Sequence, residues 1–199
     1  MHADELQRHL QRRPLRLELG CGATKRDRQS IGVDIRAMSG VDIVGDALEV
    51  LRSFPVRSID AIASEHFLEH IPDLEGLLRE AARVLKVGAT FEATVPHFSN
   101  PYYYSDPTHK TFFGLYTFGY FVTDVPLRRK VPTYIESLPF RVEETRLVFK
   151  STRPFYGRHA VKVTVGRLFD ATRWTREFWE ENLCWIFPCY EIRYVLRRL

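Results

Sequence analysis

The sequence has few cysteines and no long apolar run, and both absences narrow its class. Its three cysteines are an odd number, which is typical of reduced thiols in a cytoplasm rather than of a disulfide framework. The longest uncharged stretch, Thr111 to Thr123, is shorter than the roughly 20 residues that span a bilayer. The first residues include acidic side chains and lack the apolar core of a signal peptide. We therefore expect a cytoplasmic protein.

The surplus of basic charge is small and dispersed. The formal net charge is +4, and the basic residues form short runs such as Arg12–Arg13 and Arg128–Lys130, which are typical of solvated faces. No nucleic-acid-binding motif or long basic helix accompanies them, so nucleic acid is not the expected partner. The runs leave open a peripheral association with an anionic membrane surface.

The most informative motif contains two glycines and lacks the third glycine of a dinucleotide-binding site. An apolar run ends at Gly20 and Gly22, and a second ends at Asp34. Glycines after a buried strand let the backbone approach a ligand, and an acid closing the next strand can accept two hydrogen bonds from a ribose diol. A dinucleotide fingerprint needs a further glycine where Lys25 stands, and little room remains for a crossover helix. S-adenosyl-L-methionine carries no phosphate and does not need that glycine, so the motif favours it over NAD.

Apolar residues alternate between strand and helix spacing along the chain. Strands are predicted at 15–19, 31–35, 41–44, 59–64 and 89–95, and later at 140–150 and 191–199. Helices are predicted over 3–13, from the N-cap Asp73 to the closing Gly88, and over most of 160–187. This order predicts an α/β fold with a Rossmann-like, doubly wound sheet of about seven mostly parallel strands.

The pattern changes after the fifth predicted strand. The stretch that follows is rich in Tyr, Phe, Pro and Gly, with few charges and no clean period. We interpret it as an insertion rather than a second domain. The expected organisation is one domain over 1–199, with a cofactor-binding half at 15–95 and an aromatic acceptor-side segment at 96–135.

The ordered motifs resemble those of a known enzyme family. They are Leu17–Gly22, Ile31–Ile35, Asp42–Asp46, Ser58–Ile62, Glu65–Ile71, Val84–Ala89 and Ser105–Lys110. Together they resemble the class I S-adenosylmethionine-dependent methyltransferases, and most closely the small methyltransferases of bacterial surface-polysaccharide pathways. The resemblance covers roughly residues 15–123 and implies S-adenosyl-L-methionine as the cofactor.

The resemblance also assigns expected roles to the strand ends. It implies that Asp34 binds the ribose and that Asp46 contacts the adenine amino group, although a loop turn also explains Asp46. The other expected cofactor-binding residues are Glu18, Gly20, Cys21, Gly22, Ser64, Glu65 and His66. Cys21 is expected as a small side chain in a tight loop rather than as a nucleophile.

Catalysis at a hydroxyl would require a base, because the hydroxyl proton must be removed. The candidate catalytic residues are His97, directly after the fifth strand, and the pair Asp106 and His109. The alternative for this pair is a structural role, in which the two side chains only stabilise their loop. A metal site built from these three residues is an alternative, but none is predicted, because no further ligand has telling spacing. His70 is interpreted as architectural. Tyr103 and its tyrosine neighbours fit a glycan-binding lid or a core layer.

The expected function is therefore methyl transfer from S-adenosyl-L-methionine to a small-molecule or glycan acceptor, at a hydroxyl of a sugar or glycolipid intermediate. Two alternatives remain. One is methylation of a small metabolite, a protein or RNA, and the other is a catalytically silent partner subunit that binds the cofactor. The sequence does not indicate an oligomeric state.

Overall fold

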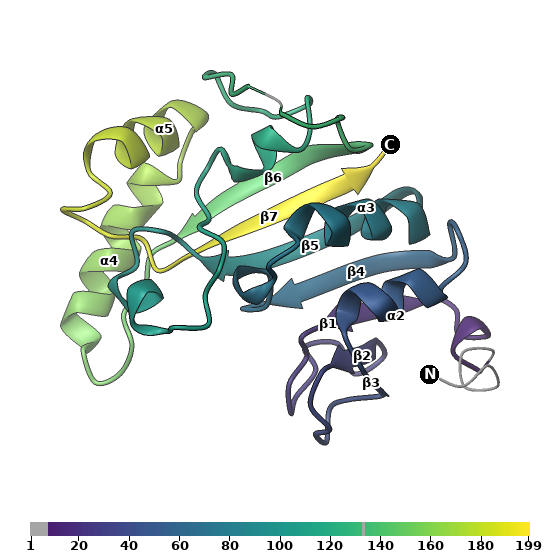
Figure 1. Cartoon of the computed structure of the whole chain (residues 1–199). Coiled ribbons are helices and arrows are strands. Elements are labelled where there is room, and N and C mark those ends of the chain that lie inside the picture. Colours follow the sequence, from purple (N-terminus) through teal and green to yellow (C-terminus); the bar gives the residue numbers. More distant parts are fainter. Residues whose placement is uncertain (1–7, 133) are drawn as a thin grey trace.

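The computed structural model describes residues 8–132 and 134–199 (Figure 1). The predicted helix over 3–13 therefore lies partly outside the described residues. The strands are β1 (Arg16–Leu19), β2 (Ile31–Asp34), β3 (Ile43–Val44), β4 (Ile59–Glu65), β5 (Leu85–Pro96), β6 (Phe140–Val148) and β7 (Glu191–Arg198). The longer helices are α2 (Ala47–Ser53), α3 (Leu74–Val84), α4 (Tyr156–Phe169) and α5 (Arg173–Asn182). Three short 3-10 helices are η1 (Leu68–His70), η2 (Pro101–Ser105) and η3 (Thr117–Tyr120).

The strands form one sheet in the order β3-β2-β1-β4-β5-β7-β6. Strands β1 to β5 pair in parallel, and β7 pairs antiparallel with both of its neighbours. At the centre, Leu17 of β1 lies beside Ile31 of β2 and Ile62 of β4, and all three are buried. The predicted Rossmann-like sheet of seven mostly parallel strands is confirmed. Its parallel strands bring their carboxyl ends to one edge, where ligands bind in such folds.

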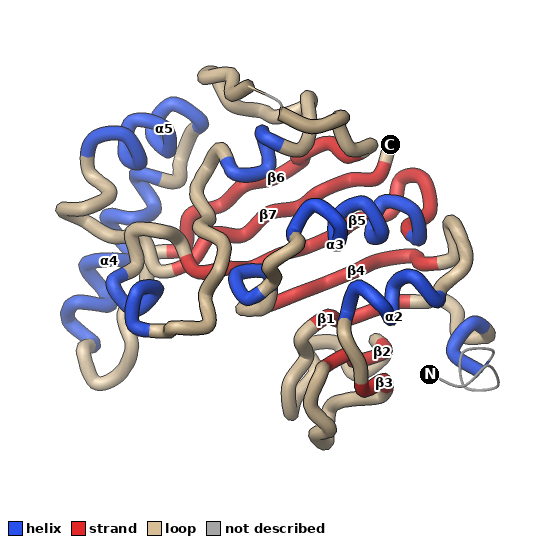
Figure 2. The backbone as a smooth tube through the Cα atoms, in the orientation of Figure 1, coloured by secondary structure: helices blue, strands red, loops and turns tan. Residues whose placement is uncertain are grey.

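Helices α2 and α3 pack against each other on one face of this sheet (Figure 2). Leu74, Leu77, Leu78 and Ala81 recur at helical spacing in α3 and are all buried. Helices α4 and α5 contact one another, and α4 packs beside β6 (Figure 1). Among the described residues, no helix is both long and apolar enough to cross a membrane.

The connection from β1 to β2 contains no helix, as the short spacing predicted. Polar side chains hold it instead. The buried carboxylate of Glu18 accepts hydrogen bonds from the backbone N–H groups of Arg26 and Asp27. Lys25 donates to the Ser30 carbonyl and pairs with Asp42 at 2.6 Å. The tight crossover therefore depends on buried charge rather than on helix packing.

Two local predictions need correction. Gly88 does not close a helix, because α3 ends at Val84 and β5 begins at the next residue, paired with Ile59 of β4. Gly88 instead lies within β5 with φ +80°. The apolar pattern also did not predict α2, whose N-cap is Asp46. Strand pairing of Leu85 with Ile59 ends α3, whereas α2 begins at a local cap that the apolar spacing did not reveal.

We predict that Asp42→Asn destabilises the protein in a pH-dependent way. Burial alone would raise the pKa of Asp42, but hydrogen bonds from Lys25 and the Gly32 N–H hold that pKa below its usual 3.8. The unfolded chain then binds the proton more tightly, so the stabilisation is present above pH 3.8 and fades as pH falls through the lowered pKa. The expected loss in free energy of unfolding near pH 7 is about 1.5–3 kcal/mol.

Urea denaturation at pH 7 and at pH 3 measures this difference. The control is Glu49→Gln, which removes an exposed ion pair with Arg52 and should cost less than about 1 kcal/mol. An equal loss at both pH values, or no loss at pH 7, would contradict the assignment.

Candidate active site

The turn after β1 contains two glycines with left-handed backbone. Gly20 has φ +67° and Gly22 has φ +58°. A Cβ atom on Gly20 would lie 2.5 Å from the Phe67 ring, so this glycine permits close packing against the segment that follows β4. A Cβ atom on Gly22 would meet nothing within 4 Å. The turn therefore packs tightly on one side and leaves open space beside its backbone on the other.

Asp34 closes β2 and faces this turn. Its Oδ2 atom accepts a hydrogen bond from the Gly22 N–H at 3.0 Å, and its Oδ1 accepts from the Arg36 N–H at 3.0 Å. A carboxylate offers about four acceptor positions, so two remain for a ligand. Asp34 is also partly exposed. It can therefore hold the glycine turn and still accept hydrogen bonds from a ribose diol.

The end of β4 supplies three neighbouring side chains. Ser64 is buried, and its Oγ atom has no hydrogen-bond partner in the described part of the chain. Such a group is costly to bury unless something bonds to it, and a polar ligand atom would satisfy it. Glu65 is exposed and pairs with Arg26 at 3.3 Å.

His66 is held between two carboxylates. Its Nε2 atom lies 3.2 Å from Glu191 and its Nδ1 lies 3.6 Å from Glu69. The hydrogen bond to Glu191 and the proximity of Glu69 raise the pKa of His66 to about 9. His66 is therefore a cation at neutral pH, and it also has φ +49°.

The remaining predicted cofactor-binding residues are Glu18, Cys21 and Asp46, and each has a structural contact of its own. Glu18 holds the crossover described above. Burial and the nearby Asp34 raise the pKa of Cys21 to about 11, so its thiol stays protonated, as expected for a packing residue. The exposed Asp46 accepts hydrogen bonds from the N–H groups of Leu48 and Glu49, which caps α2.

His97 lies in a buried network rather than at a surface. Its Nδ1 atom accepts the Ser99 N–H at 3.1 Å, and its Nε2 donates to Glu180 at 2.9 Å. The side chain is fully buried. Both ring nitrogens are therefore occupied, which favours a role in anchoring the start of the aromatic segment to α5. The predicted catalytic role of His97 stays a prediction that this geometry does not favour.

Asp106 and His109 are brought together as the sequence suggested. The His109 Nδ1–H donates to the Tyr103 carbonyl at 2.9 Å, and its Nε2 lies 3.7 Å from Asp106, just beyond hydrogen-bond distance. Hydrogen bonds from Thr108 lower the pKa of Asp106. The structure adds His70, whose ring centroid lies 4.9 Å from that of His109. The sequence motifs led to an architectural interpretation of His70, and its proximity to His109 arises from tertiary contact.

The aromatic segment divides into a buried and an exposed set. Tyr103 is buried and donates its hydroxyl to the Thr111 carbonyl at 2.7 Å. It therefore supports the loop, which favours the core-layer interpretation of Tyr103 over the glycan-binding one. Tyr102, Tyr104 and Phe112 are each at least half exposed. These three side chains form what we call the aromatic surface.

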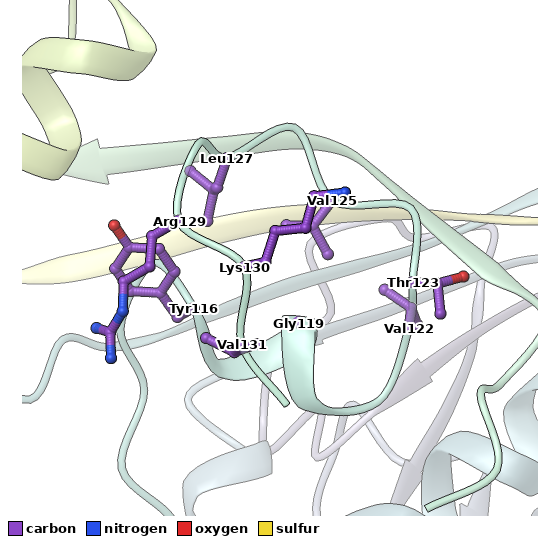
Figure 3. Close-up of a pocket in the computed structure, with 9 residues that line it drawn as sticks. All are labelled: Tyr116, Gly119, Val122, Thr123, Val125, Leu127, Arg129, Lys130 and Val131. Carbon is purple, nitrogen blue, oxygen red and sulfur yellow. The ribbon is translucent and has the colours of Figure 1, made fainter. Parts of the chain in front are cut away.

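A separate cavity of about 230 Å³ lies within the same segment (Figure 3). Its lining residues all fall within 116–131, with Arg129 over the Tyr116 ring. None of the strand-end residues lines it. Another cavity, of about 470 Å³, includes Glu18, Arg26 and Ala63 beside β1 and β4. The chemistry at the strand ends, rather than cavity size, therefore locates the candidate site.

Part of the chain matches a known protein family. The profile of the methyltransferase-domain family matches residues 17–92, which contain β1 to β4 and most of β5. None of the curated proteins matches the chain.

Several solved structures share its fold. A SAM-dependent methyltransferase from Archaeoglobus fulgidus is 21% identical with a TM-score of 0.59, and the match covers 98% of this chain and 92% of that one. A putative methyltransferase of Haloferax volcanii, solved with the Trm112 activator, is 17% identical with a TM-score of 0.55 over 99% and 90%. Geranyl diphosphate C-methyltransferase from Streptomyces coelicolor is 16% identical with a TM-score of 0.51 over 99% and 77%.

The cofactor indicated by the matched domain is S-adenosyl-L-methionine. The strand ends fit it. Asp34 has acceptor positions for the ribose hydroxyls, and Gly22 leaves space beside its backbone. The buried Ser64 hydroxyl has no partner among the residues that the structure describes. When bound, the cofactor supplies a methyl group on a positively charged sulfur.

We predict that Asp34→Asn weakens binding of S-adenosyl-L-methionine and S-adenosylhomocysteine by roughly 10- to 100-fold. The amide keeps one acceptor oxygen for the Gly22 N–H but loses the charge that strengthens the bonds to the ribose, worth about 1.5–3 kcal/mol. Isothermal titration calorimetry measures the affinity, and circular dichroism confirms folding. Asp124→Asn makes the same change at an exposed site and serves as the control. Unchanged affinity in folded Asp34→Asn would place the ribose elsewhere.

Proposed function

We propose that this S-adenosylmethionine-dependent methyltransferase transfers its methyl group to a hydroxyl of a sugar or glycolipid intermediate. The observation that carries the proposal is the position of the exposed aromatic surface. It lies near His109 and near the carboxyl ends of the parallel strands, where we propose that the methyl donor binds. Two contacts connect these parts. Gly20 packs on Phe67, directly before η1, and the Glu69 carbonyl in η1 accepts the Lys110 N–H at 2.6 Å.

The aromatic surface suits a carbohydrate. Sugars present apolar C–H faces with hydroxyls at their edges, and tyrosine combines a flat apolar ring with a polar tip. The Tyr104 hydroxyl donates to the Phe98 carbonyl at 2.9 Å, which fixes its ring, and the Tyr104 and Phe112 rings lie 6.0 Å apart. A rigid pair of exposed rings offers a stacking platform at little entropic cost.

The histidine of the Asp106–His109 pair is arranged to take a proton. Its Nδ1–H is committed to the Tyr103 carbonyl, so Nε2 carries the free lone pair. As the acceptor oxygen bonds to the methyl carbon, the sulfur–carbon bond breaks and the hydroxyl proton passes to Nε2. Asp106, at 3.7 Å, would stabilise the resulting imidazolium. Alignment and exclusion of water supply the rest of the acceleration.

The surface-polysaccharide setting rests on the resemblance of the sequence motifs, with Ser105–Lys110 as the segment that carries it. The competing proposals are a nitrogen or oxygen acceptor on a small metabolite, a protein or RNA, and a silent cofactor-binding subunit. They are separated by incubating the protein with methyl-labelled cofactor and fractionated bacterial extract. We expect label in the glycan or glycolipid fraction. Label in protein or RNA, or no transfer at all, would contradict the proposal.

We predict that His109→Ala lowers kcat by about 100-fold or more, the usual contribution of a general base, and leaves cofactor affinity nearly intact. Asp106→Ala should lower kcat less, because it only supports the imidazolium. The matched control is His159→Ala, a histidine on α4 whose ring contacts Ser151. Steady-state kinetics with the identified acceptor measure kcat, and near-normal turnover in both variants would exclude this pair as the base.

We further predict that Tyr104→Ala and Phe112→Ala raise KM for the acceptor several-fold with little change in kcat. Each removes stacking area from the ground state and the transition state alike. Tyr156→Ala, an exposed tyrosine on α4, is the control and should leave KM unchanged. If both variants keep the original KM, the acceptor does not bind at the aromatic surface.

A further inference from the structure

Three possible metal ligands meet where η1 contacts the aromatic segment. They are Glu69, His70 and His109, and one ligand atom from each lies within 4.8 Å of the other two. The Lys110 N–H and the Thr111 N–H both donate to the Glu69 carbonyl, which ties the two segments together. The cluster is thus held by backbone as well as by side chains.

One buried oxygen of Glu69 has no hydrogen-bond partner within the described residues. Its side chain is 1% exposed, and its Oε2 atom has no hydrogen-bond partner among residues 8–132 and 134–199. Its Oε1 atom lies 3.6 Å from His66. Burying a carboxylate oxygen without a partner is costly, and carboxylates in such positions are usually paired or bound to a metal. This oxygen therefore offers a buried acceptor position that a cation could occupy.

In both His70 and His109, hydrogen bonding at Nδ1 leaves Nε2 as the nitrogen with the lone pair. The Thr108 hydroxyl donates to Asp106 at 2.6 Å, so it accepts the His70 Nδ1–H at 2.9 Å. The Tyr103 carbonyl fixes the Nδ1–H of His109 in the same way. Each imidazole is left with its lone pair on Nε2. Metal-binding histidines are oriented by this pattern, in which the second nitrogen donates to a carbonyl or to a group backed by a carboxylate.

We propose that Glu69, His70 and His109 bind a divalent transition-metal ion. Two imidazoles and one carboxylate suit Zn²⁺, Fe²⁺, Co²⁺ or Mn²⁺ better than Mg²⁺ or Ca²⁺, which prefer sites made of oxygen atoms. Ligands about 2.0–2.2 Å from one ion lie at most about 4.4 Å apart, so a small rotation of the partly exposed His70 closes the set.

Three protein ligands leave coordination positions for water or for an acceptor hydroxyl. The cluster lies beside the aromatic surface, because the Tyr103 ring contacts both His109 and Phe112. A hydroxyl bound to such an ion loses its proton more readily. With the ion bound, the Nε2 atom of His109 would be a ligand, and the hydroxyl proton would pass to a solvent water instead of to this imidazole.

The test is direct metal binding by the full chain without any acceptor. Protein freed of metal by a chelator is titrated with Co²⁺ and with Zn²⁺ by calorimetry, and the absorption spectrum of the Co²⁺ form is recorded. We expect one ion per chain and a ligand-field spectrum typical of nitrogen and oxygen ligands. Glu69→Gln and His70→Ala should each weaken binding at least 10-fold, whereas His159→Ala should not.

Cofactor affinity and circular dichroism show whether each variant is folded. If Glu69→Gln fails to fold, His70→Ala decides the result, since His70 is partly exposed. Absence of stoichiometric binding, binding that survives in His70→Ala, or equal loss in His159→Ala would overturn the proposal. Because no acceptor is involved, this outcome is independent of whether the methyl acceptor is a sugar hydroxyl.

Discussion

The hydrogen bond from the Gly22 N–H to the Asp34 carboxylate fixes the geometry on which the candidate site depends. It joins the ends of β1 and β2 across a turn that has left-handed backbone at both glycines. The same turn packs through Gly20 against Phe67, at the end of β4. One short loop therefore sets the relative positions of Asp34, which we propose binds the ribose, and of the segment that leads to Glu69, His70 and His109.

The aromatic segment is positioned by buried polar contacts rather than by a regular element. His97 bonds to Glu180 of α5, and the Glu180 carboxylate also accepts the Leu115 N–H. Glu69 accepts two N–H groups of the segment at its carbonyl. These contacts hold the segment that contains the exposed rings and His109, in which the described regular elements are the short 3-10 helices η2 and η3. Such loops on a rigid sheet commonly carry specificity, because they can vary without disturbing the fold.

Apart from the short helix α2, the sequence predicted what depends on local pattern and missed what depends on distant partners. The glycine turn, Asp34 and the Asp73 cap follow from residues a few positions apart, and the structure places each of them as expected. The environment of His97 depends on Glu180, which is 83 positions away. The meeting of His70 with His109 likewise depends on tertiary contact, and so does the burial of Tyr103 between its exposed neighbours. No periodicity in the sequence reports these pairings.

A crystal structure of the protein with S-adenosylhomocysteine tests the central claim most directly. We predict the ribose on Asp34, the methionine portion along Gly20 and Gly22, and the sulfur facing the aromatic surface and His109. That arrangement would place donor and acceptor at one edge of the sheet. The account would be contradicted by a product molecule bound in the cavity within residues 116–131 or beside Glu18 and Ala63, or by a sulfur that faces away from the aromatic surface.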